Sequence, residues 1–230
     1  MNLELHKTAP EELLRAGAAE LGLSLGPAVI QQFLVYLEKL LQWNTRMNLT
    51  GMKSAQEVVV KHFLDSLAVC PWLNTVNSLA DIGTGAGFPG LPLKLALPQL
   101  HLTLVEPTGK KIAFLRYLIV LLGLQDVEVR PQYLTPALAR QWGPSFQGVI
   151  TRATFPLARF LELGGPLVRP GGRLLALKGP HLDEAQWQAA INQASLYGFG
   201  FPVREAYRLP LTHEPRLVVF WEKAPTSPAY

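Results

Sequence analysis

Three glycines lie within five residues, directly after a short apolar run that contains an acidic side chain. The run covers residues 79–82 and includes Asp81, and Gly83, Gly85 and Gly87 follow it. Glycines at alternate positions let the backbone turn sharply where a strand ends and approach a ligand without a Cβ in the way. In doubly wound sheets the ligand crevice lies outside the carboxyl ends of the strands. The loop therefore predicts a binding site for an adenosine-containing cofactor.

The glycine pattern alone is compatible with two cofactors. Gly85, Gly87 and Gly90 give the G-x-G-x-x-G spacing of dinucleotide-binding enzymes, which is a weak signal by itself. The Asp81 carboxylate would repel a pyrophosphate but could accept hydrogen bonds from an ammonium group, and Pro89 lacks the N–H that a phosphate-binding helix end supplies. S-adenosylmethionine carries an ammonium and a sulfonium and has no phosphate. We therefore predict this methyl donor and keep an NAD-dependent oxidoreductase as the alternative.

A second acidic residue fits the same ligand. Glu106 ends the next apolar run, 23 residues after Gly83. A carboxylate about 20 residues beyond such a loop commonly accepts hydrogen bonds from the ribose hydroxyls. NAD enzymes share this feature, so Glu106 supports an adenosine without deciding between the two cofactors.

The elements that must position these residues alternate regularly from residue 78 onward. We expect strands at 78–82, 101–105, 127–130, 148–151 and 173–177, with helices at 91–97, 110–122, 135–142, 157–167 and 183–197 between them. Such alternation predicts a mostly parallel sheet covered on both faces. The last two expected strands, 203–209 and 216–222, have no helix between them and should pair antiparallel. The fold class is therefore α/β, with a seven-stranded Rossmann-like sheet whose last hairpin is antiparallel.

The first 75 residues differ from the rest of the chain. Apolar residues at helical spacing predict helices at about 10–21, from 26 to beyond 41, and at 54–69. We expect one domain over residues 1–230. It consists of a helical extension (1–75), the catalytic core (76–223) and a short frayed tail (224–230).

Composition bounds the function. One cysteine, Cys70, excludes a disulfide framework, and the apolar run at 112–124 contains Arg116 and is too short to cross a bilayer, so we expect a cytoplasmic protein that does not enter membranes. Residues 1–75 hold 6 Lys+Arg against 7 Asp+Glu, whereas residues 76–230 hold 15 against 10. A basic catalytic region suits a polyanion such as nucleic acid.

These motifs together resemble those of the bacterial 16S ribosomal RNA guanine-N7 methyltransferases, also called glucose-inhibited division protein B. Residues 81–93 read Asp-Ile-Gly-Thr-Gly-Ala-Gly-Phe-Pro-Gly-Leu-Pro-Leu, and the Gly-Phe-Pro-Gly part is much more specific than a glycine loop alone. The other matching segments are Trp43-Asn44-x-x-x-Asn48-Leu49-Thr50, His62-Phe63-Leu64-Asp65-Ser66-Leu67, Lys110-Lys111-x-x-Phe114-Leu115 and Thr151-Arg152-Ala153. The resemblance covers roughly residues 40–180.

The resemblance implies a monomeric class I methyltransferase that uses S-adenosylmethionine to modify one guanine in the 16S rRNA of the small ribosomal subunit. It implies cofactor contacts at Gly83 and Phe88, and it places Arg152 at the methyl-transfer site and against the cofactor. The full expected cofactor set is Asp81, Gly83, Gly85, Gly87, Phe88, Glu106, Pro131, Gln132 and Arg152. The chain departs from the family pattern at Glu106-Pro107, where Asp-Ser is usual, and at Pro131-Gln132, where Ala-Glu is usual. A neutral glutamine accepts more weakly than a carboxylate.

Methylation at guanine N7 needs no general base, because N7 carries a lone pair and no proton. Catalysis then rests on positioning and on oriented charges. In agreement, the box that engages exocyclic amines is absent after the fourth strand, where Thr151-Arg152-Ala153 stands. We predict Arg152 as the catalytic residue, binding guanine O6, a phosphate or a base face, with a surface ion pair as the alternative.

Four further residues are candidates for RNA binding: Asn44, Asn48, Lys111 and Lys178. Asn44 and Asn48 lie four apart on one helix face, and a turn or capping role is equally open to them. His62 and Asp65 favour a hydrogen-bonded packing pair over a metal site, and no metal is expected. A non-catalytic RNA-binding assembly factor that has kept the fold is a second alternative, suggested by Gln132.

Overall fold

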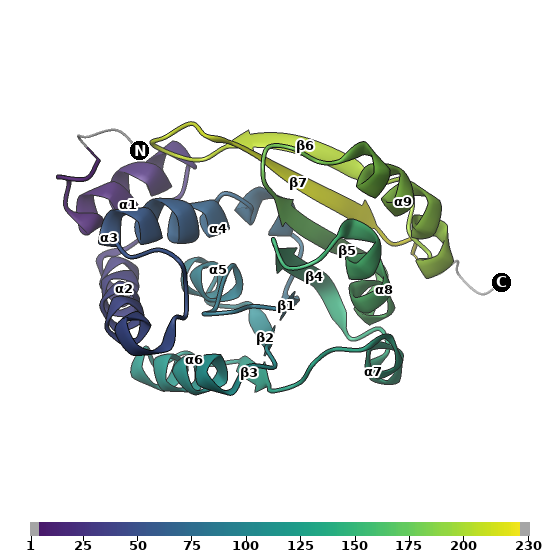
Figure 1. Ribbon diagram of the computed structural model, residues 1–230, viewed down its shortest axis with the longest axis horizontal. Coiled ribbons are helices and arrows are strands. Elements are labelled where there is room, and N and C mark those ends of the chain that lie inside the picture. Colours follow the sequence, from purple (N-terminus) through teal and green to yellow (C-terminus); the bar gives the residue numbers. More distant parts are fainter. Residues whose placement is uncertain (1–4, 226–230) are drawn as a thin grey trace.

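The computed structural model describes residues 5–225. Its centre is a seven-stranded mixed sheet (Figure 1). Its strands are β1 (Ser78–Ile82), β2 (His101–Val105), β3 (Val127–Arg130), β4 (Phe146–Arg152), β5 (Val168–Lys178), β6 (Val203–Arg208) and β7 (Pro215–Glu222). Their spatial order is β3-β2-β1-β4-β5-β7-β6. The first five are parallel, and β7 pairs antiparallel with both β5 and β6. The expected Rossmann-like sheet with an antiparallel last hairpin is confirmed.

The strand order reverses between β1 and β4, and this switch point creates the crevice. The chain moves outward from β1 through β2 to β3 and then returns to β4, which pairs with β1 through Asp81 and Ile150. The carboxyl ends of β1 and β4 are joined by a buried hydrogen bond from the Thr151 hydroxyl to the Ile82 carbonyl at 2.8 Å. The loop that follows β1 and the residues that follow β4 therefore open onto the same crevice.

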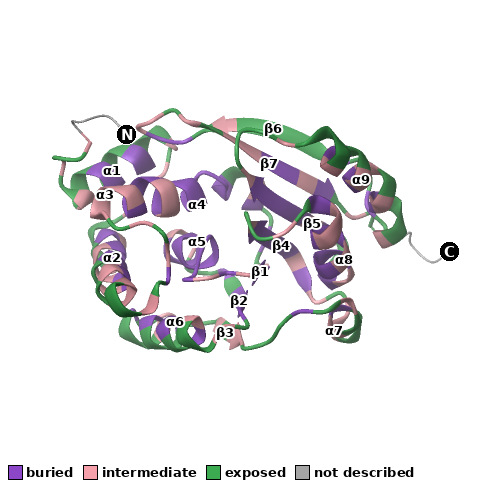
Figure 2. Ribbon diagram, in the orientation of Figure 1, coloured by how far each residue is buried: buried purple, intermediate pink, exposed green. Residues whose placement is uncertain are grey.

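The two faces of the sheet bury alternate side chains, as period-two strands require. Leu79 and Ile150 belong to one apolar cluster, and Ala80 and Val149 belong to the other. The first face is covered by α2 (Pro27–Met47), α5 (Gly90–Ala96) and α6 (Gly109–Leu121). The second is covered by α7 (Pro136–Trp142), α8 (Leu157–Gly164) and α9 (Glu184–Ala194). Figure 2 shows the buried central strands against the exposed edge strand β6.

The helical extension packs into the first of these clusters. It contains α1 (Pro10–Glu20), α2, α3 (Ala55–Val58) and α4 (Asp65–Leu67). Phe33, Tyr36 and Phe63 have no exposed surface and lie in one cluster with Leu79 and Leu91 of the core. The extension thus shares its hydrophobic core with the sheet, although the division of the chain at residue 75 stays a prediction.

The helix expected over about residues 54–69 is confirmed as helical backbone from Ala55 to Leu67, but it is not α-helical throughout. The Ser54 hydroxyl caps α3 by accepting from the Glu57 N–H at 3.1 Å, but a π-helical turn at Val59–Leu64 separates α3 from α4. A π turn adds a residue to the helical repeat without changing the apolar composition. The turn rotates the next residues, and it lies in the segment that holds His62.

Strand β5 also differs from the expectation, because it begins at Val168 and not at 173. Gly171 has a φ of 75°, and a Cβ at Gly172 would lie 2.5 Å from the Gln147 carbonyl oxygen. The pairing register with β4 shifts between Phe146 and Gly148. Two glycines in a run usually indicate a turn, but here they allow a close approach inside a bulged strand.

At the carboxyl end of the described chain, Lys223 forms a bridge with Phe199, and the Ala224 N–H donates to the Gly198 carbonyl at 3.0 Å. The rest of the expected tail, 226–230, lies outside the described residues. Within residues 5–225, no helix has the length and apolar character needed to cross a membrane.

Candidate active site

The loop between β1 and α5 uses its glycines in different ways. Gly83, Gly85 and Gly87 all have positive φ, at 72°, 63° and 108°. A Cβ at Gly83 would lie 2.7 Å from the Thr154 side chain, and one at Gly87 would lie 2.7 Å from the Tyr36 hydroxyl. Nothing lies within 4 Å of the Cβ position of Gly85. The loop therefore packs closely on both sides and leaves open space above Gly85.

Asp81 holds this loop from inside. Its Oδ2 accepts from the Thr84 hydroxyl at 2.6 Å and from the Gly90 N–H at 2.8 Å, and the side chain has no exposed surface. Burial raises the pKa of the Asp81 carboxyl to about 6, against the opposing effect of these hydrogen bonds. Its Oδ1 is buried without a hydrogen-bond partner among the described residues. Asp81 was predicted to meet a ligand ammonium; in this conformation its contacts are with the loop, and the ligand contact stays a prediction.

The same contact bears on which cofactor fits. Gly90 is the first residue of α5, and its N–H is one of the free donors that a phosphate would need at a helix start. The Asp81 carboxylate already occupies that donor, and Pro89 before it has no N–H. The loop therefore lacks the open, positive helix end on which a pyrophosphate rests.

Glu106 lies opposite the open side of the loop. Its Oε2 accepts from the Gly85 N–H and its Oε1 accepts from the Thr108 N–H, both at 3.0 Å. It borders a cavity of about 280 Å³ whose lining includes Gly83, Glu106, Thr108, Gln132, Tyr133 and Thr154. Each carboxylate oxygen keeps a second lone pair, so two ribose hydroxyls can still donate to it. We call it the donor cavity, and its binding of an adenosine with the ribose toward Glu106 stays a prediction.

The lining of the donor cavity includes a residue that the sequence did not indicate. Gln132 lines the cavity as expected, whereas Pro131 is exposed and is not part of the lining. Tyr133 also lines it and is 66% exposed, which leaves its ring free to meet a base. An aromatic residue directly after Pro131-Gln132 is the sequence feature from which Tyr133 could have been predicted to line the cavity.

Phe88 lies between two rings of the helical extension. Tyr36 stacks on it with ring centroids 5.4 Å apart and an angle of 6°, and His62 stacks on it at 4.3 Å and 15°. The Tyr36 hydroxyl donates to the Ala86 carbonyl of the loop at 2.6 Å. Phe88 was predicted to contact the cofactor, but its ring is buried and its described contacts hold the glycine loop against α2 and the π-helical turn.

Arg152 lies at the end of β4, beside the same rings. Its Nη2 contacts His62 Nδ1 at 2.6 Å, and its Nη1 donates to the Lys61 carbonyl at 3.1 Å and to Asp65 Oδ2 at 3.3 Å. The guanidinium carbon lies 5.1 Å from the centre of the Phe88 ring. Arg152 is thus held in a partly buried ion pair with Asp65, and its catalytic role stays a prediction.

These contacts fix the state of His62. Burial and the charge of Arg152 lower the pKa of His62 to about 3, so the imidazole is neutral. Arginine is only a donor, so Nδ1 must accept and the proton must lie on Nε2. Nε2–H then donates to the Thr50 hydroxyl at 2.8 Å. The expected packing pair of His62 with Asp65 is replaced by two separate contacts to Arg152.

Asp65 joins the extension to the last hairpin. Its Oδ1 accepts from the Tyr207 hydroxyl at 2.9 Å and lies 3.7 Å from Arg216 Nε, while its Oδ2 pairs with Arg152. The carboxylate is buried and therefore needs these partners. Tyr207 and Arg216 come from β6 and β7, and nothing in their local sequence pointed to this site.

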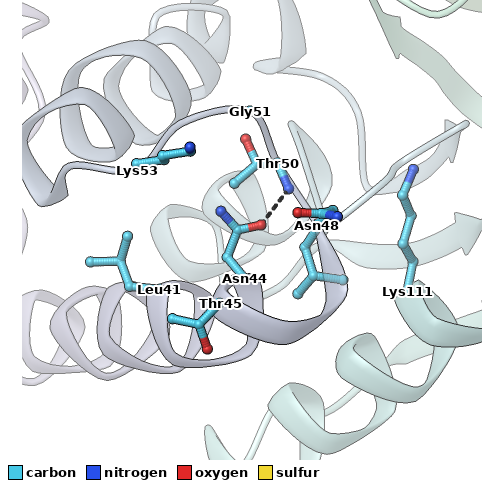
Figure 3. A pocket seen from close by; sticks show the side chains of 9 residues that line it. Leu41, Asn44, Thr45, Asn48, Thr50, Gly51, Lys53 and Lys111 are labelled. Carbon is cyan, nitrogen blue, oxygen red and sulfur yellow. Dashed lines mark hydrogen bonds between the residues drawn. The ribbon is translucent and has the colours of Figure 1, made fainter.

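The four residues predicted to bind RNA do not lie together, and Lys111 lines both the donor cavity, 4.0 Å from Glu106, and a larger cavity near the end of α2. Asn44, Asn48 and Lys111 line a cavity of about 680 Å³ between the end of α2 and α6 (Figure 3). Asn44 uses its side chain inside the protein, since Oδ1 accepts from the Thr50 N–H at 2.9 Å and Nδ2 donates to the Met52 carbonyl at 3.1 Å. The turn role left open for Asn44 is therefore what the structure shows, and Lys178 lies elsewhere, in the cavity of Arg152.

The switch-point crevice, the glycine loop and the Glu106 cavity define a class I S-adenosylmethionine-dependent methyltransferase. A family model described as rRNA small subunit methyltransferase G matches residues 29–199. The chain belongs to this family. The resemblance noted in the sequence and the predicted methyl donor are thereby confirmed, and the NAD-dependent alternative is not favoured.

Individual relatives agree over nearly the whole chain. The ribosomal RNA small subunit methyltransferase G of Roseiflexus castenholzii is 43% identical over 96% of this chain and 94% of its own length. That of Myxococcus xanthus is 38% identical over 93% and 97%. Among solved structures, an O-methyltransferase from Bacillus cereus in complex with SAH has a TM-score of 0.57 at 18% identity, covering 82% of this chain and 91% of that one. This likeness concerns the fold alone.

Proposed function

We propose that the protein transfers a methyl group to N7 of a guanine in the 16S rRNA of the small ribosomal subunit. The observation that carries this proposal is the state of the groups around Arg152. His62 is neutral and accepts from the guanidinium, and Asp65 is paired with Arg152, Tyr207 and Arg216. Among the described residues that touch Arg152, none is a free base, and guanine N7 is an acceptor that needs none.

The residues of the donor cavity would hold S-adenosylmethionine, with the ribose at Glu106, the adenine near Gln132 and Tyr133, and the methionine part along Gly83 and Gly85. This group supplies a methyl on a sulfonium: N7 uses its lone pair to form the new bond to carbon, the carbon–sulfur pair returns to sulfur, and the positive charge moves to the guanine. The chain's own contribution is to orient both reactants and to keep water out.

Arg152 suits the acceptor end of this reaction. Guanine presents O6 and N7 as neighbouring acceptors on one edge. A guanidinium that donates to O6 orients the base and leaves the N7 lone pair free for the methyl group. The contacts to His62, Lys61 and Asp65 fix the plane of the guanidinium, so its remaining donors have one direction.

We further propose that the protein acts as a monomer in the cytoplasm, where the small subunit is assembled. The monomeric state is what the family resemblance noted in the sequence implies. The non-catalytic assembly factor suggested by Gln132 is not favoured, because the chain belongs to a methyltransferase family.

The test uses small ribosomal subunits from a strain that lacks this methylation, incubated with labelled donor and, in parallel, naked 16S rRNA. We expect label in one guanine that becomes sensitive to borohydride and aniline cleavage, which is specific for N7-methylguanosine. Label on an adenine or on an exocyclic nitrogen would contradict the N7 assignment. RNA binding without incorporation would favour the assembly factor.

A further inference from the structure

A second cavity adjoins the donor cavity across the residues that follow β4. Arg152 and Ala153 line this cavity of about 380 Å³, whereas the next two residues, Thr154 and Phe155, line the donor cavity. The chain reverses there with Ala153 at a φ of 54°. We call it the acceptor cavity, because Arg152 is the side chain that connects it to the glycine loop.

The acceptor cavity is strongly basic. Its lining contains four cationic side chains, from Lys61, Arg152, Lys178 and Arg216, and one carboxylate, from Asp65. Asp65 is shared by Arg152 and Arg216. In the described part of the chain, Lys61 forms no ion pair within 4 Å. The donor cavity is lined by one carboxylate, Glu106, and one cation, Lys111, which lies 4.0 Å from it, so the acceptor cavity carries the larger positive charge.

The two lysines of the acceptor cavity, Lys61 and Lys178, are positioned by contacts within the protein, and their ammonium groups keep N–H donors for a ligand. The Lys178 ammonium donates to the Phe155 carbonyl, which uses one of its three N–H groups. The Lys61 carbonyl accepts from Arg152, so the backbone under this side chain is fixed by the same arginine. Both lysines are half-buried and line the cavity from different elements.

The remaining walls are apolar and narrow the choice of ligand. Met52, Leu177 and Pro180 line the cavity together with Tyr207. Apolar and aromatic walls beside cations are what a nucleotide requires, with a flat base on one side and a phosphate on the other. A free anion would need the cations without these walls.

We propose that the acceptor cavity receives one nucleotide turned out of the RNA, with its base beside Arg152 and Met52 and its flanking phosphate on Lys61 and Lys178. Enzymes that modify a base generally take it out of its stack, because the target atom is otherwise out of reach. The proposal rests on the proposed function and adds the phosphate contacts and the place of the base to it.

The first experiment compares Lys61→Gln with Arg169→Gln. Arg169 is an exposed residue at the start of β5, and Lys178 lies at the other end of the same strand. The control therefore removes the same charge at the opposite end of β5. Binding of a labelled rRNA fragment is measured against salt, and affinity for S-adenosylhomocysteine is measured by thermal shift. KM for RNA and kcat are determined separately.

We expect Lys61→Gln to weaken RNA binding by about tenfold and to make the slope of log K against log salt shallower by about 0.7, as for one contact to a single-stranded phosphate. KM for RNA should rise more than kcat falls, Lys61→Arg should restore binding, and donor affinity should stay at the wild-type value. Equal behaviour of Lys61→Gln and Arg169→Gln would overturn the phosphate contact. A parallel loss of donor affinity would assign the cavity to the donor instead.

A second readout tests the extruded base. An RNA with 2-aminopurine in place of the modified guanine should become more fluorescent when the wild-type protein binds it, because the base leaves its stack. Unchanged fluorescence with tight binding would remove the base from the cavity. Wild-type protein that binds RNA in this way without methylating any RNA would contradict the proposed function and leave the acceptor cavity standing.

Discussion

The donor cavity and the acceptor cavity lie side by side and are built in opposite ways. The donor cavity depends on a contiguous loop, with backbone turns at Gly83 and Gly85 and carboxylates at Asp81 and Glu106. The acceptor cavity depends on cations brought together from the extension, from β4 and β5 and from the last hairpin. A cationic methyl donor and an anionic RNA require opposite charges, and Arg152 stands at the border between them.

The largest effect is expected on the donor side, from Gly83→Ala. A Cβ there would lie 2.7 Å from Thr154, and the φ of 72° is unfavourable for alanine. Binding of S-adenosylhomocysteine, measured by calorimetry, should weaken by on the order of 100-fold, which corresponds to about 2.7 kcal/mol.

The matched control is Gly123→Ala, which has a φ of 63° and open space around its Cβ position, in the turn after α6. It should cost about 1–3 kcal/mol of stability from backbone strain alone and leave the donor affinity unchanged. If the two variants bound the donor equally well, the close packing of the loop would not matter for binding.

An effect of similar size, on turnover and not on donor binding, is expected at the border, from Arg152→Ala. This change removes the side chain that contacts His62, Lys61 and Asp65, so the acceptor base loses its orienting group. Methyl transfer should fall by about 10²-fold in kcat/KM, comparable to the loss of one oriented donor in an active site. Single-turnover incorporation of labelled methyl into the subunit measures it.

Arg159→Ala is the control for Arg152→Ala, because Arg159 lies on α8 and pairs with Glu162 three residues away. A half-exposed pair of this kind contributes little, so near-normal turnover is expected. Near-normal turnover of Arg152→Ala as well would remove Arg152 from the site.

His62 gives the acceptor side a signature in pH. Its pKa is lowered from 6.5 to about 3 in the folded state, so between these values the unfolded chain binds a proton that the folded chain does not. This lowers the free energy of unfolding as the pH falls from 6.5 toward 3.

Relative to His62→Gln, the wild type should therefore lose about 2 kcal/mol of stability between pH 7.5 and pH 5, as 1.36 kcal/mol per pKa unit implies. Urea unfolding at both pH values measures the difference. His181→Gln, at an exposed position, should unfold with the same pH dependence as the wild type. A constant difference between the wild type and His62→Gln at the two pH values would mean that His62 titrates normally.

Asp81 on the donor side should act with the opposite sign. Its pKa is raised from 3.8 to about 6, so the unfolded chain ionises first and stability falls as the pH rises through this window. The contributions of His62 and Asp81 to the pH dependence of stability therefore have opposite signs, and the His62 variant is needed to separate them.

The smallest effect on turnover is expected from Tyr207→Phe, which removes one hydrogen bond to Asp65 and leaves the packing of the ring intact. Loss of one such hydrogen bond to a charged group should lower the free energy of unfolding by about 1.5–3 kcal/mol. Turnover should fall only a few-fold, because Asp65 keeps Arg152 and Arg216 as partners.

Tyr197→Phe serves as its control, because no hydrogen bond of the Tyr197 hydroxyl occurs in the described structure. The two variants, Tyr207→Phe and Tyr197→Phe, are compared by thermal unfolding and by the pH profile of kcat. Identical profiles for the two variants would show that the last hairpin does not position Arg152.

The difference between the two cavities also explains what sequence reasoning could find. The donor loop is contiguous, and its glycines, Asp81 and Glu106 follow strands that the period-two pattern predicts, so the sheet and this half of the site were accessible. The acceptor cavity joins Lys61, Arg152 and Arg216, which are far apart in the chain. Only the packing of the extension and the hairpin against the sheet brings them together.

Local errors have similar causes. The π-helical turn at Val59–Leu64 lies in a run that is buried on nearly every side, so no change in apolar spacing marks the extra residue. Asn44 shares a helix face with Asn48, which suggested RNA binding, but its amide is used by the backbone of the loop at Thr50 and Met52. In both cases the residue types indicated the region of the molecule, and the backbone and side-chain hydrogen bonds determined the local structure.

We propose that one crevice holds the donor at the Glu106 carboxylate and the RNA at the cations of the acceptor cavity. The most direct test measures the affinities for S-adenosylhomocysteine and for the rRNA fragment on Glu106→Gln and Lys61→Gln. We predict that Glu106→Gln loses donor affinity and keeps RNA affinity, and that Lys61→Gln does the reverse. Loss of both affinities in each variant would contradict the separation of the two cavities.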